Sequence, residues 1–174
     1  MDNISVWMNV NEVLLKGGFL IFLAAAGYQD LKDRRIHICL FLAFGTAGAA
    51  LKGIHMVLEL RSYIAGYGME EAWIQAGKHF KDTGMAVMVG GALLALSAAT
   101  GEAGGRGDGW FFVVSGIYLD FARNLLLRCG GLRLCVLACA VLFMRGMGNG
   151  RDVRHMRLPF LPFLVPAGMG VMFL

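Results

Sequence analysis

The sequence Gly104-Gly105-Arg106-Gly107-Asp108-Gly109 places one acid and one base among four glycines. Residues 84–100 on its N-terminal side and residues 109–124 on its C-terminal side are both predominantly apolar. A short glycine-rich turn between two such segments is typical of a connection between helices that cross a membrane. We therefore expect Asp108 to lie where a transmembrane helix begins, with the rest of the chain arranged around it.

The composition supports a membrane location. Of the 174 residues, 57% are hydrophobic and 16% are charged, with a mean hydropathy of +0.63. Soluble domains carry about 25% charged residues, and a water-soluble protein this apolar would expose large hydrophobic patches. The length predicts a single integral-membrane domain over residues 1–174. The net charge of +4 forms no basic stripe interleaved with aromatic residues, so the sequence indicates no nucleic-acid partner.

The pattern of apolar segments predicts an all-α protein with six transmembrane helices. Residues 69–80 carry an apolar stripe at Trp73, Ala76 and Phe80, so we expect an amphipathic helix in the membrane interface between the second and third spans. All three prolines fall in the last segment, which predicts a kink or an irregular start there. The predicted spans are residues 13–28, 36–54, 84–100, 109–124, 130–144 and 158–174.

The alternation of the spans places two acids together. Asp30 ends the first predicted span and Asp108 begins the fourth, so both lie on the same side of the membrane at similar depth. The basic residues divide evenly, eight to each side. Those on the side of the aspartates are concentrated in short loops, which count most in the positive-inside rule. We therefore predict that the aspartates face the cytoplasm.

Two carboxyl groups on one face suggest aspartyl protease chemistry. An isolated Asp titrates near about 4, but two neighbouring carboxyls cannot both ionise easily, so one keeps its proton. The ionised group can then activate water while the protonated one donates to a carbonyl oxygen, and the sequence does not assign these roles. Gly105 and Gly107 can adopt positive φ and let a substrate backbone approach. The alternatives are that Asp108 only caps a helix and that Asp30 is a solvated acid in a basic loop.

The sequence predicts no metal site and no cofactor. The four histidines lack metal-ligand spacing, and the four cysteines form no C-x-x-C pair. Asp120 is expected to pair with Arg123 at i,i+3, and Glu102 and Asp152 share the face of the two aspartates by topology. The histidines are His37, His55, His79 and His155, and the cysteines are Cys39, Cys129, Cys135 and Cys139.

Three motifs resemble a known family. Gly105-Arg106-Gly107-Asp108 matches the GxGD motif of intramembrane aspartyl peptidases. Asp30-Leu31-Lys32-Asp33-Arg34-Arg35-Ile36 resembles the D-L-x-x-R-x-I-P-N segment after the first span of type IV prepilin peptidases. Leu158-Pro159-Phe160-Leu161-Pro162-Phe163 resembles the I-P-F-x-P-F opening of their last span. The chain is similar to the short form of this family, found in Tad-type pilus assembly and among preflagellin peptidases.

The resemblance implies that Asp30 and Asp108 are catalytic, with Gly105, Gly107 and Gly109 supporting the second motif. It implies a multi-pass enzyme of the cytoplasmic membrane that serves type IV pili and protein secretion. The expected substrate is prepilin-like, with a hydrophobic N-terminal helix preceded by a basic leader that is removed at the cytoplasmic face. Long members of the family also methylate the new N-terminus and carry an extra N-terminal segment. We expect proteolysis without methylation here.

Two departures from the family pattern leave other functions open. The Pro-Asn of the first motif is His37-Ile38 in this chain, and the usual Val-Lys after the second aspartate is Gly109-Trp110. The alternatives are a non-catalytic membrane scaffold that binds pilin-like helices, and a small ion or proton transporter that uses the two aspartates.

Overall fold

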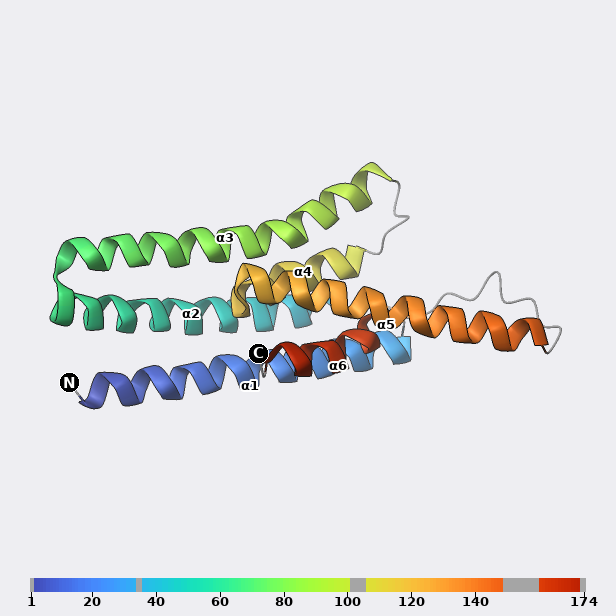
Figure 1. The fold of residues 1–174 in the computed structure, drawn as a ribbon, viewed down its shortest axis with the longest axis horizontal. Helices are drawn as coiled ribbons and strands as arrows, with labels where there is room; N and C mark the ends of the chain where they lie inside the picture. Colours follow the sequence, from blue (N-terminus) through green and yellow to red (C-terminus); the bar gives the residue numbers. More distant parts are fainter. Residues whose placement is uncertain (1, 34–35, 101–105, 149–159, 173–174) are drawn as a thin grey trace.

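The computed structural model describes residues 2–33, 36–100, 106–148 and 160–172. This part of the chain is helical and contains no strand, which confirms the all-α prediction for it. The helices are α1 (Asp2–Asp33), α2 (Ile38–Tyr67), α3 (Met69–Ala99), α4 (Arg106–Tyr118), α5 (Phe121–Gly148) and α6 (Leu161–Met172) (Figure 1).

Four helices have the length and composition needed to cross a membrane, namely α1, α2, α3 and α5. Helix α4 has 13 residues and α6 has 12, whereas a span needs about 17–25 residues. In the described residues, the six predicted spans therefore correspond to four helices of spanning length and two short ones.

Two predicted boundaries are wrong. Residues 69–80 do not form a separate interfacial helix, because they are the first turns of the 31-residue α3, which runs on without a break. The break expected after residue 124 falls instead at Leu119 and Asp120. Leu125, Leu126 and Leu127 are strong helix formers and continue α5 through the predicted loop.

The connections between helices have identifiable causes. Gly68 has φ of +96°, a left-handed angle that glycine adopts without strain, and it turns the chain from α2 into α3. After α1, the N–H of His37 donates to Gln29 Oε1 at 3.2 Å, which fixes the start of α2 against the end of α1. Between α4 and α5, the carboxylate of Asp82 in α3 accepts the N–H of Phe121 at 3.2 Å. This hydrogen bond satisfies the backbone N–H of the first residue of α5.

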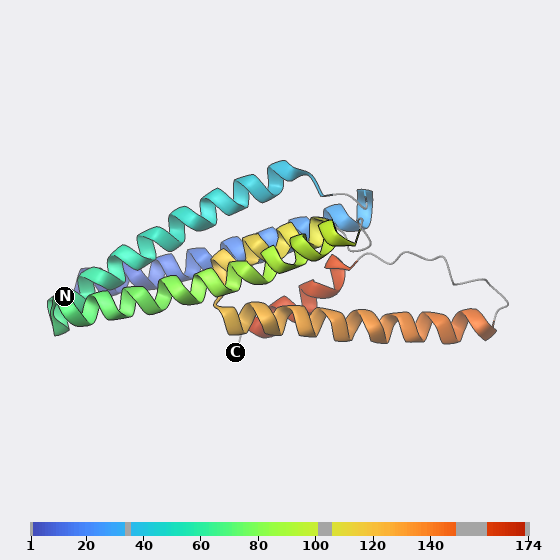
Figure 2. The same ribbon diagram turned by 90° about the horizontal axis from the view of Figure 1, so that it is seen from above.

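The helices form two groups that share α1. Helix α4 packs against α1, α2 and α3, and most closely against α3 (Figure 1). Helix α6 packs against both α1 and α5, so that α5 lies on the far side of α6 from α1 (Figure 2). Helix α4 thus lies among α1, α2 and α3, and α6 lies between α1 and α5. The N-terminal ends of both short helices lie at the end of the bundle where α1 finishes (Figure 1).

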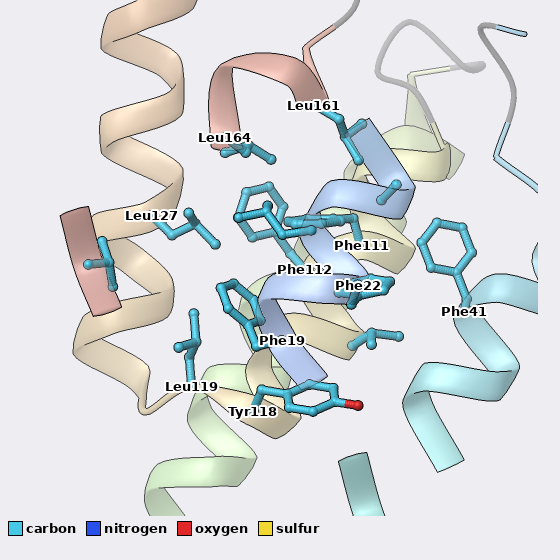
Figure 3. Close-up of a cluster of buried hydrophobic side chains, with 14 of the residues drawn as sticks. Phe19, Phe22, Phe41, Phe111, Phe112, Tyr118, Leu119, Leu127, Leu161 and Leu164 are labelled. Carbon is cyan, nitrogen blue, oxygen red and sulfur yellow. The ribbon is translucent and has the colours of Figure 1, made fainter. Parts of the chain in front are cut away.

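Aromatic side chains fill the centre of this arrangement (Figure 3). Phe22 of α1 stacks on Phe111 of α4 with ring centroids 5.1 Å apart and an interplanar angle of 13°. Phe19 and Phe112 are also fully buried, and Leu161 and Leu164 of α6 contribute to the same cluster. This core connects the C-terminal half of α1 to the two short helices.

Small residues bring α3 and α4 into backbone contact. A Cβ added to Gly116 would lie 2.7 Å from the carbonyl carbon of Ala86, and one added to Gly90 would collide with the backbone of Val113. Close approach through small residues is a common mode of helix association in membranes. It sets the position of α4, and therefore of Asp108, relative to α3.

A buried amide ties the start of α5 to this pair. Asn124 Nδ2 donates to the carbonyl of Ala86 at 2.9 Å and to that of Phe112 at 3.3 Å. Asn124 Oδ1 accepts a hydrogen bond from Ser115 Oγ at 2.8 Å. Both polar side chains are fully buried and satisfied, so the network holds α3, α4 and α5 in one register.

Candidate active site

Asp30 and Asp108 come together at one end of the bundle, although 78 residues separate them in sequence. The last turns of α1 and the first turns of α4 and α6 meet there (Figure 1). Both side chains are half-buried. The alternation of apolar segments predicts that the two aspartates share one end of the bundle, and this holds although α4 and α6 are shorter than expected.

Asp30 is held by the beginning of α6. Its Oδ2 accepts the backbone N–H of Leu161 at 3.1 Å. Pro162 has no N–H, and the N–H of Phe163 donates to the carbonyl of Phe160 at 3.1 Å, which gives α6 the irregular start that its prolines predict. A hydrogen bond from a helix N-terminus stabilises the ionised form of a carboxylate. The geometry therefore distinguishes Asp30 from Asp108.

Asp108 is the third residue of α4 and lies outside the four helices of spanning length. Burial, together with the negative charge of Asp30, raises the pKa of its carboxyl from the ordinary value of 3.8 to about 6. Two carboxyl groups that interact in this way favour a state in which one is ionised and the other protonated. Around pH 6 the pair can therefore both accept and donate a proton.

Of the glycines around Asp108, Gly109 allows two helices to pack closely. A Cβ on Gly109 would lie 2.6 Å from Leu94 Cδ2 and 3.1 Å from the Leu94 backbone nitrogen, so this position allows α4 to approach α3. Gly107 is helical. A Cβ added to it would lie 3.6 Å from Ile36 Cδ1, which is an ordinary van der Waals distance. Among the described glycines only Gly68 has positive φ. The expectation of positive φ at Gly107 is therefore wrong, and Gly105 lies outside the described residues.

The two departures from the resembled motifs lie beside this pair. His37 has φ of −68°, an angle that proline also adopts, but its N–H is used in the bond to Gln29. Histidine therefore keeps the local backbone and adds a donor. Trp110 is 42% exposed on α4, two residues after Asp108, so its indole ring is available to the lipid or to a bound partner.

The remaining candidate residues are placed as follows. Arg123 and Asp120 form the predicted pair at 3.6 Å. The four cysteines are free. Within the described ranges, no group of three or more His, Cys, Asp or Glu side chains is suited to a metal ion. Glu102, Asp152 and His155 lie outside those ranges.

Two features of the site could not be predicted from the types of residue in the sequence. The donor to Asp30 is the backbone N–H of Leu161, and a main-chain group leaves no trace in composition. The contact between Gly109 and Leu94 depends on which residue of α3 faces it. For the donor to Asp30, the one signal in the sequence is Pro162, because proline is common in the first turn of a helix and so marks where backbone N–H groups are unpaired.

No known protein-family model, curated protein or solved structure matches this chain. The resemblance to prepilin peptidases therefore rests on the three motifs quoted above. The proximity of Asp30 and Asp108 is independent of that resemblance, because it follows from the packing of α1, α4 and α6.

The raised pKa of Asp108 predicts a pH-dependent effect on stability. A carboxyl with a raised pKa destabilises the folded state at pH values above that pKa, because its charged form is buried, and this cost disappears below the ordinary pKa. Asp108→Asn should therefore increase the free energy of unfolding at pH 8 by about 1–3 kcal/mol and change it little at pH 4. Unfolding in detergent at the two pH values measures this.

Asp33→Asn, at an exposed position near the end of α1, is the matched control and should be neutral at both pH values. An Asp108→Asn effect that is the same at pH 4 and pH 8 would contradict the burial of this carboxyl beside Asp30.

Proposed function

We propose that this protein is an intramembrane aspartyl endopeptidase of the prepilin peptidase type. The observation that carries the proposal is the pairing of Asp30 with Asp108, in which the charge of Asp30 and burial together raise the pKa of Asp108 to about 6. Hydrolysis by two carboxyl groups requires that one of them keep its proton while the other is ionised, and a raised pKa at Asp108 favours that state.

The two carboxyls take different roles in this proposal. Asp30 accepts the N–H of Leu161, which favours its ionised form, so Asp30 takes the proton from the attacking water. Asp108 keeps its proton up to about pH 6 and donates it to the carbonyl oxygen of the scissile peptide bond. When the tetrahedral intermediate collapses, Asp30 gives its proton to the leaving amine and the C–N bond breaks. Asp108 takes a proton back from a hydroxyl of the gem-diol as the new carboxyl group forms, so the pair is restored.

The membrane arrangement follows from the same site. We place all six helices in the membrane, with α4 and α6 as short segments whose N-terminal ends reach the boundary on the side of the aspartates. The basic residues of the short loops on that side favour the cytoplasmic face. At this boundary the apolar bundle limits water around the two carboxyls, while the ends of the helices remain open to a substrate.

The proposed substrate is a prepilin-like protein. Its hydrophobic helix would lie in the bilayer against the bundle, and its basic leader would extend into the cytoplasm past the acidic pair. The motifs at Asp30, Asp108 and Leu161 support this choice because each resembles a segment of the prepilin peptidases. The exposed Trp110 beside Asp108 is a candidate contact for the substrate helix.

Leader removal in cells tests the function. We expect the wild-type chain and the Asp33→Asn control to shorten a co-expressed prepilin. Asp30→Asn and Asp108→Asn should each reduce the rate by about 10²-fold or more, because each removes one half of the acid–base pair. Electrophoretic mobility and the mass of the pilin report cleavage.

Undiminished cleavage in either aspartate variant would refute the catalytic assignment. Co-purification of intact prepilin without cleavage by the wild type would support the scaffold alternative. A proteoliposome ion flux that needs both aspartates, without proteolysis, would support the transporter alternative.

The proposed roles predict a specific effect of the Leu161 N–H. Leu161→Pro deletes this donor at the first position of α6, where proline is well tolerated, whereas Leu161→Ala keeps the donor and removes the buried side chain. We expect Leu161→Pro to slow leader cleavage about tenfold, since a hydrogen bond to a charged group contributes about 1.5–3 kcal/mol, and to move the acid limb of the pH–rate profile to higher pH. Leu161→Ala should leave that limb in place. Identical profiles for the two variants would contradict the assignment of Asp30 as the base.

A further inference from the structure

A second polar cluster lies well away from the aspartates. Lys16 precedes Asp30 by fourteen residues, which is about 21 Å along α1 at 1.5 Å per residue. Near Lys16 are Lys52 of α2, His79 of α3 and Arg123 of α5, which together line one hollow. Since the hydrocarbon core of a bilayer is about 30 Å thick, this cluster belongs to the half of the membrane opposite the aspartates.

Two hollows adjoin at this cluster. The polar hollow, about 200 Å³, is lined by the charged residues of α1, α2 and α5 together with Asp120 and Tyr118. The apolar hollow, about 240 Å³, lies between α2 and α3 and is lined mainly by Ala49, Gly53, Met56, Phe80 and Ile117. Lys52, His55 and His79 line both hollows. The two therefore form one site with a polar end and an apolar end.

Among the described residues that line the polar hollow, three are permanent cations and two are carboxylates, while Glu59 lines the apolar hollow and not the polar one. Glu12 pairs with Lys16 at 2.7 Å. Asp120 is shared between Lys52 at 3.8 Å and Arg123 at 3.6 Å. The distances from Asp120 to Lys52 and to Arg123 both exceed the length of a hydrogen bond. The single carboxylate of Asp120 therefore forms only loose ion pairs with the two cations. An uncompensated positive charge among apolar helices is costly, and a single anion between Lys52 and Arg123 would balance it.

The histidines lie where the two hollows meet. Glu59 is 3.3 Å from His79 Nε2 and 3.9 Å from His55 Nε2, so its carboxylate is directed at the imidazoles rather than at Lys52. His55 Nδ1 is buried and has no hydrogen-bond partner in the described part of the chain. A buried polar atom without a partner costs about 1–3 kcal/mol, and the polar part of a ligand entering this site would satisfy it.

We propose that the paired hollows bind one anionic phospholipid, with its phosphate between Lys52 and Arg123 and an acyl chain in the apolar hollow between α2 and α3. The excess of cations at the polar end favours an anion there, because Glu59 lies against His79 at the apolar hollow. The adjoining apolar hollow favours an anion that carries a hydrocarbon chain. A soluble phosphate would fill only the polar end. The site is separate from the aspartates, and its occupancy does not depend on the peptidase proposal.

Thermal unfolding of the purified protein in a neutral detergent tests this site. Addition of phosphatidylglycerol should raise the Tm in a saturable manner by about 3–5 °C, as expected for a ligand present well above its Kd. Phosphatidylcholine and inorganic phosphate at matched concentration should give little shift. Native mass spectrometry should show one bound phosphatidylglycerol per chain.

Two pairs of variants separate the two ends of the site. Gly53→Leu would fill the apolar hollow, and no atom lies within 4 Å of a Cβ added there, so the helix accepts the larger side chain. Gly77→Leu is equally unobstructed but lies outside the hollow, and it is the control. At the polar end, Arg123→Gln is matched by Lys78→Gln, an exposed position on α3 outside the hollows.

We expect Gly53→Leu and Arg123→Gln each to weaken phosphatidylglycerol binding at least tenfold, while both controls bind as the wild type does. An equal Tm shift with phosphatidylcholine would overturn the requirement for an anion. An equal shift with inorganic phosphate would indicate a soluble anion site instead. Unchanged binding in Gly53→Leu would exclude an acyl chain from the apolar hollow.

Discussion

The burial of one carboxyl group beside another is the constraint on which this structure depends. Asp108 is raised in pKa to about 6 because it is withdrawn from water and faces the charge of Asp30. Such an arrangement opposes folding near neutral pH, so the surrounding contacts must hold it in place. Unfavourable ionisable pairs of this kind are common at functional sites, because catalysis needs the same perturbed protonation.

Contacts from the neighbouring helices hold the two carboxyl groups in place. Helix α6 directs the N–H of Leu161 at Asp30, and the stacked rings of Phe22 and Phe111 join α1 to α4. Glycines at the α3–α4 contact bring the two backbones together. The buried amide of Asn124 then fixes α5 against both. The long helix α1 carries Asp30, and the short helix α4 carries Asp108. The short helix α6 orients Asp30 through the N–H of Leu161.

The apolar periodicity of the sequence was enough to predict an all-helical membrane bundle and the common face of Asp30 and Asp108. It could not give the lengths of α4 and α6, because hydropathy does not show where a tertiary contact ends a helix. The turn at Asp120 is set by Asp82, a side chain 39 residues away along the chain from Phe121. The role of Gly109 depends on Leu94, and the donor to Asp30 is a main-chain group. Interactions between distant segments account for each of these misses.

The two polar regions of the bundle differ in a way that suits different tasks. At the aspartates, two acidic groups lie close together and the pKa of Asp108 is raised to about 6. About 21 Å away along α1, both cations and carboxylates line two adjoining hollows. Gly68 joins α2 to α3 beyond this second region.

The most direct measurement of the central claim is cross-linking between positions 30 and 108 in native membranes. Asp30→Cys and Asp108→Cys would be combined in a chain whose four native cysteines are replaced. Ile36→Cys and Gly107→Cys form the positive control pair, because a Cβ added at position 107 would lie 3.6 Å from Ile36 Cδ1. The account predicts that a short thiol cross-linker joins residues 30 and 108 as efficiently as the control pair. Cross-linking of the control pair alone would contradict it.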